Sequence, residues 1–182
     1  MRLYRVFPYL RSAEAGAPGH PLYLPPCGGG RLDNPTLYTV LYASDSQVGA
    51  VAETFGRRAE WSKDMLSGIH SVRGSRRALV EFDVEDDADV CNLDSAAKLV
   101  ELALRPSDVV TRNRRITQAW AHAIFSMKRY IGARWWSYYN PRFSSYGIWN
   151  IERLRVQSVE LLKLDSSSVQ DAATALCRII KR

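Results

Sequence analysis

The chain has 182 residues, of which 46% are hydrophobic and 24% are charged, and these values are typical of one folded globular domain. Its three cysteines are odd in number and widely spaced and include no C-x-x-C pair, so the sequence indicates neither a zinc site nor a redox pair and fits a reducing, cytoplasmic compartment. It has neither the apolar segment of a signal peptide nor the roughly 18 consecutive apolar residues of a membrane span, so we expect no membrane contact. The net charge of +6 favours a polyanionic ligand, nucleic acid or an acidic protein partner, although it can also serve solubility alone.

The first half of the chain predicts two strands, a long loop and a helix. Residues 2–7 alternate in polarity and predict a short strand. Residues 12–30 are rich in Gly, Pro and Ala and predict a loop or lid, which is long enough for a functional role. Residues 38–43 predict a second strand, and Ser44-Asp45 offers an N-cap for a helix that runs to about Arg58.

The second half alternates strands and helices without a strict βαβ repeat, which indicates an α+β fold. The strongest strand candidate is residues 78–84, and the longest predicted helix is residues 112–130, ended by Gly132. An amphipathic helix at residues 94–104 stops before Pro106. The remaining predictions are strands at 134–137, 146–150 and 156–164 and a closing helix at 168–181.

Residues 28–31 contain two features that could contact a ligand. Gly28-Gly29-Gly30 lacks the following Lys-Ser/Thr and the strand–helix setting of a phosphate-binding loop, so we interpret it as flexible loop. Arg31 follows directly, and a guanidinium beside glycine backbone is suited to bidentate phosphate binding. The histidines His20, His70 and His122 show neither metal spacing nor a nucleophile partner, so none is assigned a catalytic role.

Glu53 is the candidate carboxylate. It lies on the predicted helix among small residues, including Gly49 and Ala50, which leave room for a ligand. Burial in such a place would suit the carboxylate to acid/base work. The segment 134–142 (RWWSYYNPR) combines aromatic rings with arginines, which can stack on nicotinamide or a nucleobase, although packing in a core strand is the ordinary alternative.

The order and spacing of these residues resemble the RES domain family, which is named for an Arg, a Glu and a Ser. The matching segments, in chain order, are Tyr4-Arg5, Arg31, Leu41-Tyr42-Ala43-Ser44, Ala50-Val51-Ala52-Glu53, Thr117-Gln118-Ala119-Trp120-Ala121, Gly132 and Ser137. The resemblance is strongest over residues 2–165. Two departures from the family pattern are the long loop between Arg5 and Arg31 and the residue Tyr139. Tyr139 stands where the family often has an arginine, and Arg142 is the candidate to replace that arginine.

The resemblance implies a single RES domain over residues 1–182 with an ADP-ribosyltransferase-like fold, in which small sheets flanked by helices surround an NAD cleft. It also implies the toxin of a bacterial toxin–antitoxin pair, which cleaves the nicotinamide–ribose bond of NAD and so depletes it. NAD is then the substrate, and no metal is needed. The implied partner is a cognate Xre-like antitoxin that forms a hetero-oligomer with the toxin, and nucleic acid is contacted only through that antitoxin.

The family pattern also implies a role for each matched residue. Glu53 would stabilise the positive charge that develops on the ribose, and Tyr42 would stack on the nicotinamide or pack on its ribose. Arg31 and Arg5 would neutralise the pyrophosphate. Ser137 would hydrogen-bond the ribose or the Glu53 carboxylate. The acceptor stays open among water, inorganic phosphate and a protein side chain.

Three alternatives differ from NAD depletion. A protein ADP-ribosyltransferase would use the same residues with a protein acceptor. A basic RNA-acting toxin would use the cationic surface and the aromatic segment as an RNA platform. A non-catalytic module on the same fold is disfavoured because Arg31, Tyr42, Glu53 and Ser137 are all present.

Overall fold

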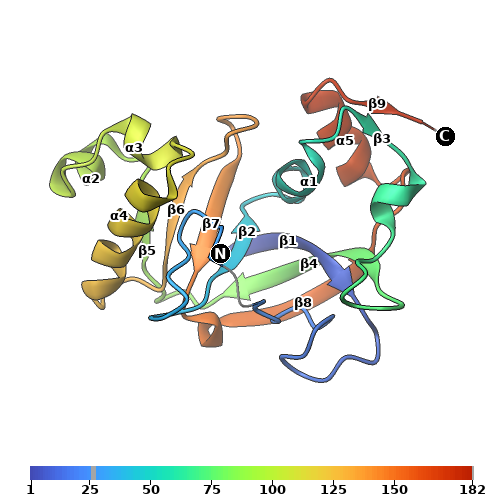
Figure 1. The fold of residues 1–182 in the computed structure, drawn as a ribbon, viewed down its shortest axis with the longest axis horizontal. Coiled ribbons are helices and arrows are strands. Elements are labelled where there is room, and N and C mark those ends of the chain that lie inside the picture. Colours follow the sequence, from blue (N-terminus) through green and yellow to red (C-terminus); the bar gives the residue numbers. More distant parts are fainter. Residues whose placement is uncertain (26–27, 182) are drawn as a thin grey trace.

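A mixed seven-stranded sheet runs through the computed structural model, which describes residues 1–25 and 28–181 (Figure 1). All neighbouring strands are antiparallel except β5 and β6, which are parallel. In spatial order the strands are β5 (Val90–Asn92), β6 (Gly132–Trp136), β7 (Ser144–Ile148), β2 (Leu41–Ser44), β1 (Arg2–Tyr9), β4 (Arg76–Val84) and β8 (Leu154–Leu161).

The sheet consists of two halves joined at one point. β1 pairs with β4 along its whole length, but its register with β2 contains the single pair Tyr4–Ser44. We therefore distinguish a first half-sheet, β5–β6–β7–β2, from a second half-sheet, β1–β4–β8. Their strands run in clearly different directions in Figure 1. The predicted α+β class is confirmed, and the joint accounts for the expectation of small sheets around a cleft.

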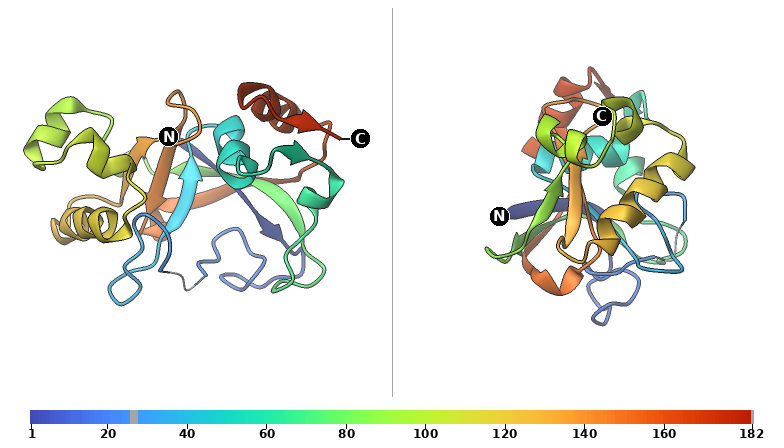
Figure 2. Two further views of the ribbon diagram at one scale, coloured as in Figure 1. Left: turned by 45° about the horizontal axis from the view of Figure 1, so that its top comes forward. Right: turned by 90° about the vertical axis from the view of Figure 1, so that its left-hand side faces the viewer.

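Each half-sheet carries its own helices, at opposite ends of the molecule (Figures 1 and 2). α3 (Pro106–Val110) and α4 (Arg114–Ser126) contact β6 of the first half-sheet, and α2 (Ala96–Glu101) joins the same apolar cluster through Leu99. α1 (Gln47–Phe55) contacts β1 of the second half-sheet and β2 at the joint, and α5 (Ser167–Ala175) packs against α1. Shorter elements are the 3-10 helices η1 (Lys63–Leu66) and η2 (Ile151–Arg153) and a small parallel sheet of β3 (Glu60–Trp61) and β9 (Ile179–Ile180).

Separate apolar clusters hold the two helical layers in place. Trp120, Ile124 and Trp135 pack between α4 and β6, and Val51 and Trp61 belong to the cluster that joins α1, α5 and β1. Burying large side chains of this kind stabilises each layer by about 1.5–3 kcal/mol per residue. The joint between the half-sheets therefore lies between two well-packed regions, and it is there that a cleft opens.

Several predicted helix ends are wrong, for reasons that lie in the backbone. The closing helix predicted at 168–181 ends at Ala175, because Cys177 has a positive φ of 51° and the chain then enters β9. The helix predicted at 112–130 ends at Ser126, before Lys128 with φ 56°. Pro106 follows α2 and also begins α3. In the first turn of a helix the backbone N–H groups have no partner within the helix, so proline, which has no N–H, is tolerated there.

Candidate active site

A cavity of about 320 Å³ opens at the joint between the two half-sheets. This volume lies at the lower end of the range of roughly 300–1,000 Å³ found for small-molecule sites. Its walls come from β1, β2, α1, β6, β7, the loop after residue 28 and the start of α4. The lining residues are Tyr4, Arg5, Val6, Arg31, Tyr42, Ala43, Ser44, Ala50, Glu53, Thr54, Arg114, Trp135, Tyr138 and Ser145.

The Glu53 carboxylate is held by two serine hydroxyls. Its Oε1 accepts a hydrogen bond from Ser137 Oγ at 2.5 Å and another from Ser145 Oγ at 3.0 Å. Ser137 Oγ in turn accepts from the backbone N–H of Tyr139 at 3.1 Å, so its own proton is directed to the carboxylate. None of the described residues donates a hydrogen bond to the second carboxylate oxygen. The site therefore presents a carboxylate in a fixed orientation with one oxygen still available.

Glu53 reaches this position because α1 starts at a defined point. The side chain of Ser46 caps the helix by accepting from the N–H of Gly49 at 3.1 Å. Gly49, Ala50 and Ala52 are buried against the protein, which leaves Glu53 on the side of α1 that faces the cleft. Glu53 is an exposed residue, so the burial that would have suited its carboxylate to acid/base work is not found, and the carboxylate is open to the cleft.

Arg31 lines the cleft and contributes a positive charge to it. Its guanidinium donates to backbone carbonyls at the end of α3, to Val109, to Val110 at 3.4 Å and to Thr111 at 3.0 Å. It also lies 5.9 Å from the centre of the Trp135 ring. Burial, together with the nearby positive charge of Arg114, lowers the pKa of Arg31 to about 10. The guanidinium therefore stays protonated at neutral pH.

The Tyr42 hydroxyl points into the loop and its ring lines the cleft. The hydroxyl donates to Asp33 Oδ1 at 2.6 Å and accepts from the N–H of Leu32 at 2.9 Å. The ring meets the Trp135 ring edge to face at a centroid distance of 6.4 Å. Tyr42 therefore offers the cleft an aromatic surface, while its hydroxyl fixes the segment that carries Arg31.

Arg5 ties the long loop to β1. Its Nη1 donates to the backbone carbonyls of Pro21 and Tyr23, both at 3.1 Å, and the side chain also lines the cleft. The loop predicted at 12–30 is thus attached to a residue of the cleft wall over the part that the structure describes. Pro26 and Cys27, which belong to the same prediction, lie outside the described residues.

The three glycines before Arg31 are anchored to α4. Gln118 Nε2 donates to the carbonyls of Gly28 and Gly30 at 2.9 and 3.1 Å, and Arg114 Nε donates to the carbonyl of Gly29 at 2.9 Å. The N–H of Gly30 donates to Asp33 Oδ2 at 2.7 Å. A segment interpreted from sequence as flexible therefore has every one of its carbonyls held by a side chain.

Gly30→Ala tests how tightly this loop is fitted. A Cβ at residue 30 would lie 2.3 Å from the Tyr42 hydroxyl and 2.6 Å from Asp33 Oδ1. We expect Gly30→Ala to fold but to lose about tenfold or more of the catalytic rate at this cleft, because a displacement of about 1 Å within a site can lower the rate by that factor. Gly29→Ala is the matched control, since a Cβ there meets nothing within 4 Å. Equal activity of the two variants would show that the Tyr42–Asp33 contact does not shape the site.

Three polar residues of the cleft, Thr54, Arg114 and Ser145, were not predicted from the sequence. Ser145 could have been found from strand alternation, because Ser144 and Ser145 on β7 point to opposite faces and one of them must face the joint. Arg114 belongs to a run of arginines at the start of α4, and no sequence signal distinguishes it from Arg112 or Arg115.

Other candidates lie outside the cleft. None of the three histidines is among its lining residues, and neither is Arg142, an exposed residue whose backbone N–H donates to Asn140 Oδ1. Tyr139 packs near Gly56, where a Cβ would come within 2.7 Å of its ring. The structure therefore gives no support to a replacement of the missing family arginine by Arg142.

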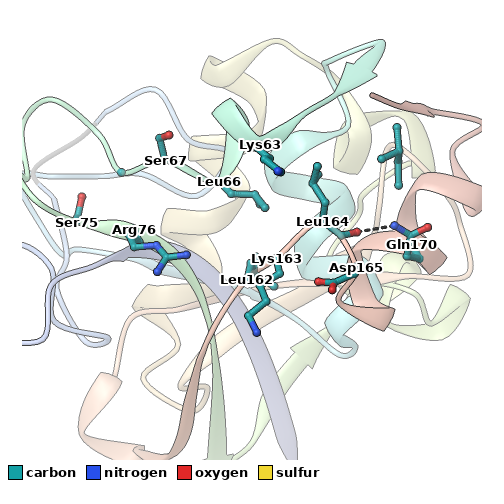
Figure 3. A pocket seen from close by; sticks show the side chains of 12 residues that line it. Lys63, Leu66, Ser67, Ser75, Arg76, Leu162, Lys163, Leu164, Asp165 and Gln170 are labelled. Carbon is teal, nitrogen blue, oxygen red and sulfur yellow. Dashed lines mark hydrogen bonds between the residues drawn. The ribbon is translucent and has the colours of Figure 1, made fainter. Parts of the chain in front are cut away.

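A second, larger hollow lies beside α5 and η1 (Figure 3). Its volume is about 1060 Å³, and its apolar lining residues include Leu66, Leu162 and Leu164. The charged lining residues are three cations, Lys63, Arg76 and Lys163, and the carboxylate of Asp165. Among residues 1–25 and 28–181, no hydroxyl donates a hydrogen bond to that carboxylate. The larger volume favours this hollow as a ligand site, but the held carboxylate favours the cleft at Glu53.

No helix in residues 1–25 and 28–181 has the length and apolar character needed to cross a membrane. In the same residues, no group of three or more His, Cys, Asp and Glu side chains is placed to hold a metal ion.

Cys91 is buried, which raises the pKa of its thiol to about 11, and Cys177 is exposed.

The fold and the cleft define an α+β protein with a carboxylate held by two hydroxyls in a cation-lined site. The RES domain family matches residues 2–167, nearly the whole chain, and the chain belongs to this family. The resemblance expected over residues 2–165 is therefore confirmed.

A comparison with solved structures agrees with this assignment. A chain of the "Crystal structure of the M.tuberculosis MbcT-MbcA toxin-antitoxin complex" superimposes with a TM-score of 0.63 at 17% identity. The match covers 97% of this chain and 88% of that one, so the two share their overall fold. No curated protein matches the chain in sequence.

Proposed function

We propose that this chain is the toxin of a toxin–antitoxin pair and that it cleaves the nicotinamide–ribose bond of NAD. The observation that carries the proposal is the Glu53 carboxylate, held through Oε1 by Ser137 and Ser145 at the edge of a cleft lined by arginines. Membership of the RES family and a shared fold with a chain of a toxin–antitoxin complex support it.

The proposed chemistry is substitution at the anomeric carbon of the nicotinamide ribose. As nicotinamide leaves, the ribose gains oxocarbenium character, and a carboxylate close to that carbon stabilises the positive charge. Glu53 would supply the negative charge. The two serines would hold its carboxylate in position before the reaction, so that the site needs no reorganisation as the ribose becomes positive. The ring of Tyr42 would contact the nicotinamide or its ribose, and the positive charges of Arg31 and Arg5 would favour the pyrophosphate.

The test is to incubate the purified full chain with NAD, with and without inorganic phosphate, and to identify the products by NMR or mass spectrometry. Nicotinamide release supports the proposal, and the second product names the acceptor: ADP-ribose for water, ADP-ribose-1″-phosphate for phosphate, a modified protein for transfer. Well-folded protein that leaves NAD intact, also in the presence of a cell extract as a source of acceptors, would overturn it. RNA cleavage by the same preparation would then favour the RNA-acting alternative.

The proposed partner is a cognate antitoxin with an Xre-like helix-turn-helix domain, which would neutralise the toxin in a hetero-oligomer. The net charge of +6 suits an acidic partner segment. The measurement is co-purification of the tagged chain with the product of the adjacent gene. A chain that is encoded alone, without such a neighbour, would contradict the pairing.

A further inference from the structure

Arg114 contains a donor that the described residues do not satisfy. Its Nη1 is buried and has no hydrogen-bond partner in that part of the chain. The Nε of the same guanidinium donates to Gly29 O at 2.9 Å, which holds the side chain against the loop. Burying an N–H without an acceptor is unfavourable, so a group of this kind at a cleft indicates a missing acceptor.

A second guanidinium lies close to this one. Arg31 and Arg114 line the same cleft, and the charge of Arg114 is one of the causes that lower the pKa of Arg31. No acid in the described residues forms an ion pair with either of them, and the acid that acts on Arg31 is Glu53, which the two serines already hold. Two like charges, neither of which is ion-paired to an acid of the described residues, favour the binding of an anion in a half-buried cleft.

The three arginines at the start of α4 differ in their surroundings. Arg112 donates to the Tyr138 hydroxyl at 3.2 Å and lies 5.1 Å from the centre of that ring. Arg115 is exposed and does not line the cleft. Among the three, Arg114 alone is a lining residue of the cleft.

We infer that Arg114, with Arg31 beside it, forms a subsite for a phosphoryl group in the cleft. Guanidinium groups bind phosphoryl oxygens through paired, charge-assisted hydrogen bonds, and the unsatisfied Nη1 and the charge of Arg31 both favour such a ligand. The choice of a phosphoryl group rests on the proposed function, whose substrate carries a pyrophosphate. The same chemistry fits free inorganic phosphate as the acceptor, and the experiment separates these two sources.

The experiment measures ligand binding without any reaction. The full chain carries Glu53→Gln in every sample, and calorimetry at constant ionic strength gives the Kd for ADP, for inorganic phosphate and for adenosine. We expect Arg114→Gln to weaken ADP about tenfold or more, as the loss of a hydrogen bond to a charged group does. Arg115→Gln, the matched control, is expected to leave the Kd for ADP within about twofold, because it removes a charge that is exposed to solvent. Adenosine, which has no phosphate, should bind all variants equally.

Each result decides a distinct point. Weakened ADP with unchanged inorganic phosphate assigns the subsite to the pyrophosphate, and weakening of both assigns it to free phosphate as well. Arg114→Lys provides a second variant that keeps one charge without the fork, and its ADP affinity should lie between those of the parent and Arg114→Gln. Folded Arg114 variants that bind ADP and phosphate like the parent would overturn the inference. Arg114-dependent binding in a chain that does not cleave NAD would instead overturn the proposed function and leave the subsite standing.

Discussion

Glu53→Gln should abolish nicotinamide release from NAD, with a loss in kcat of about a thousandfold, the upper range for removing one electrostatic group from a site. Glutamine has the shape of glutamate, and its amide oxygen can still accept from Ser137 and Ser145, so we expect the cleft to keep its geometry. What is lost is the negative charge that would stabilise the oxocarbenium-like ribose. The measurement is the initial rate of nicotinamide formation, with unfolding temperature as the check on folding.

Glu160→Gln is the matched control, because Glu160 is an exposed residue on β8, outside the cleft. It should leave both the rate and the growth arrest caused by expression unchanged. Growth arrest that persists undiminished in Glu53→Gln would mean that catalysis by this carboxylate is not the cause of toxicity. Loss of arrest together with loss of nicotinamide release would connect the two.

Local patterns were sufficient for most of the sheet and for the position of Glu53. The alternation in residues 2–7 and the strong strand at 78–84 correspond to β1 and β4, which pair along the whole of β1. Apolar residues at helical spacing correspond to α1, although its cap is Ser46 and not Ser44-Asp45. Spacing along the chain placed Arg31, Tyr42 and Glu53 in one family pattern, and the structure brings all three to the same cleft.

What the sequence did not predict depends on contacts between distant segments. β5 has three residues and β3 and β9 have two each, so their pairing is decided by neighbours and not by local pattern. Arg114 faces the cleft only because α4 packs against the loop at 28–30, about 85 residues earlier in the chain. The exposure of Glu53 likewise follows from the open joint between the half-sheets, which no helical pattern reveals.

Ser137→Ala and Ser145→Ala test whether the two hydroxyls position the carboxylate. Each removes a hydrogen bond to a charged acceptor, which is worth about 1.5–3 kcal/mol, so each should lower kcat for nicotinamide release by about 10- to 100-fold. The KM for NAD should change little, because the hydroxyls act on Glu53 and not on the bound substrate. Ser158→Ala, at an exposed position of β8, is the control that should leave both constants unchanged.

The double variant gives the sharper result. Both hydroxyls donate to the same oxygen, so either one alone still limits rotation of the carboxylate, whereas loss of both frees it. The double variant should therefore lose more kcat than the product of the two single effects, as expected for residues that share a partner. Effects that multiply without excess, or a rise in KM at constant kcat, would instead mean that the serines contact the substrate independently of Glu53.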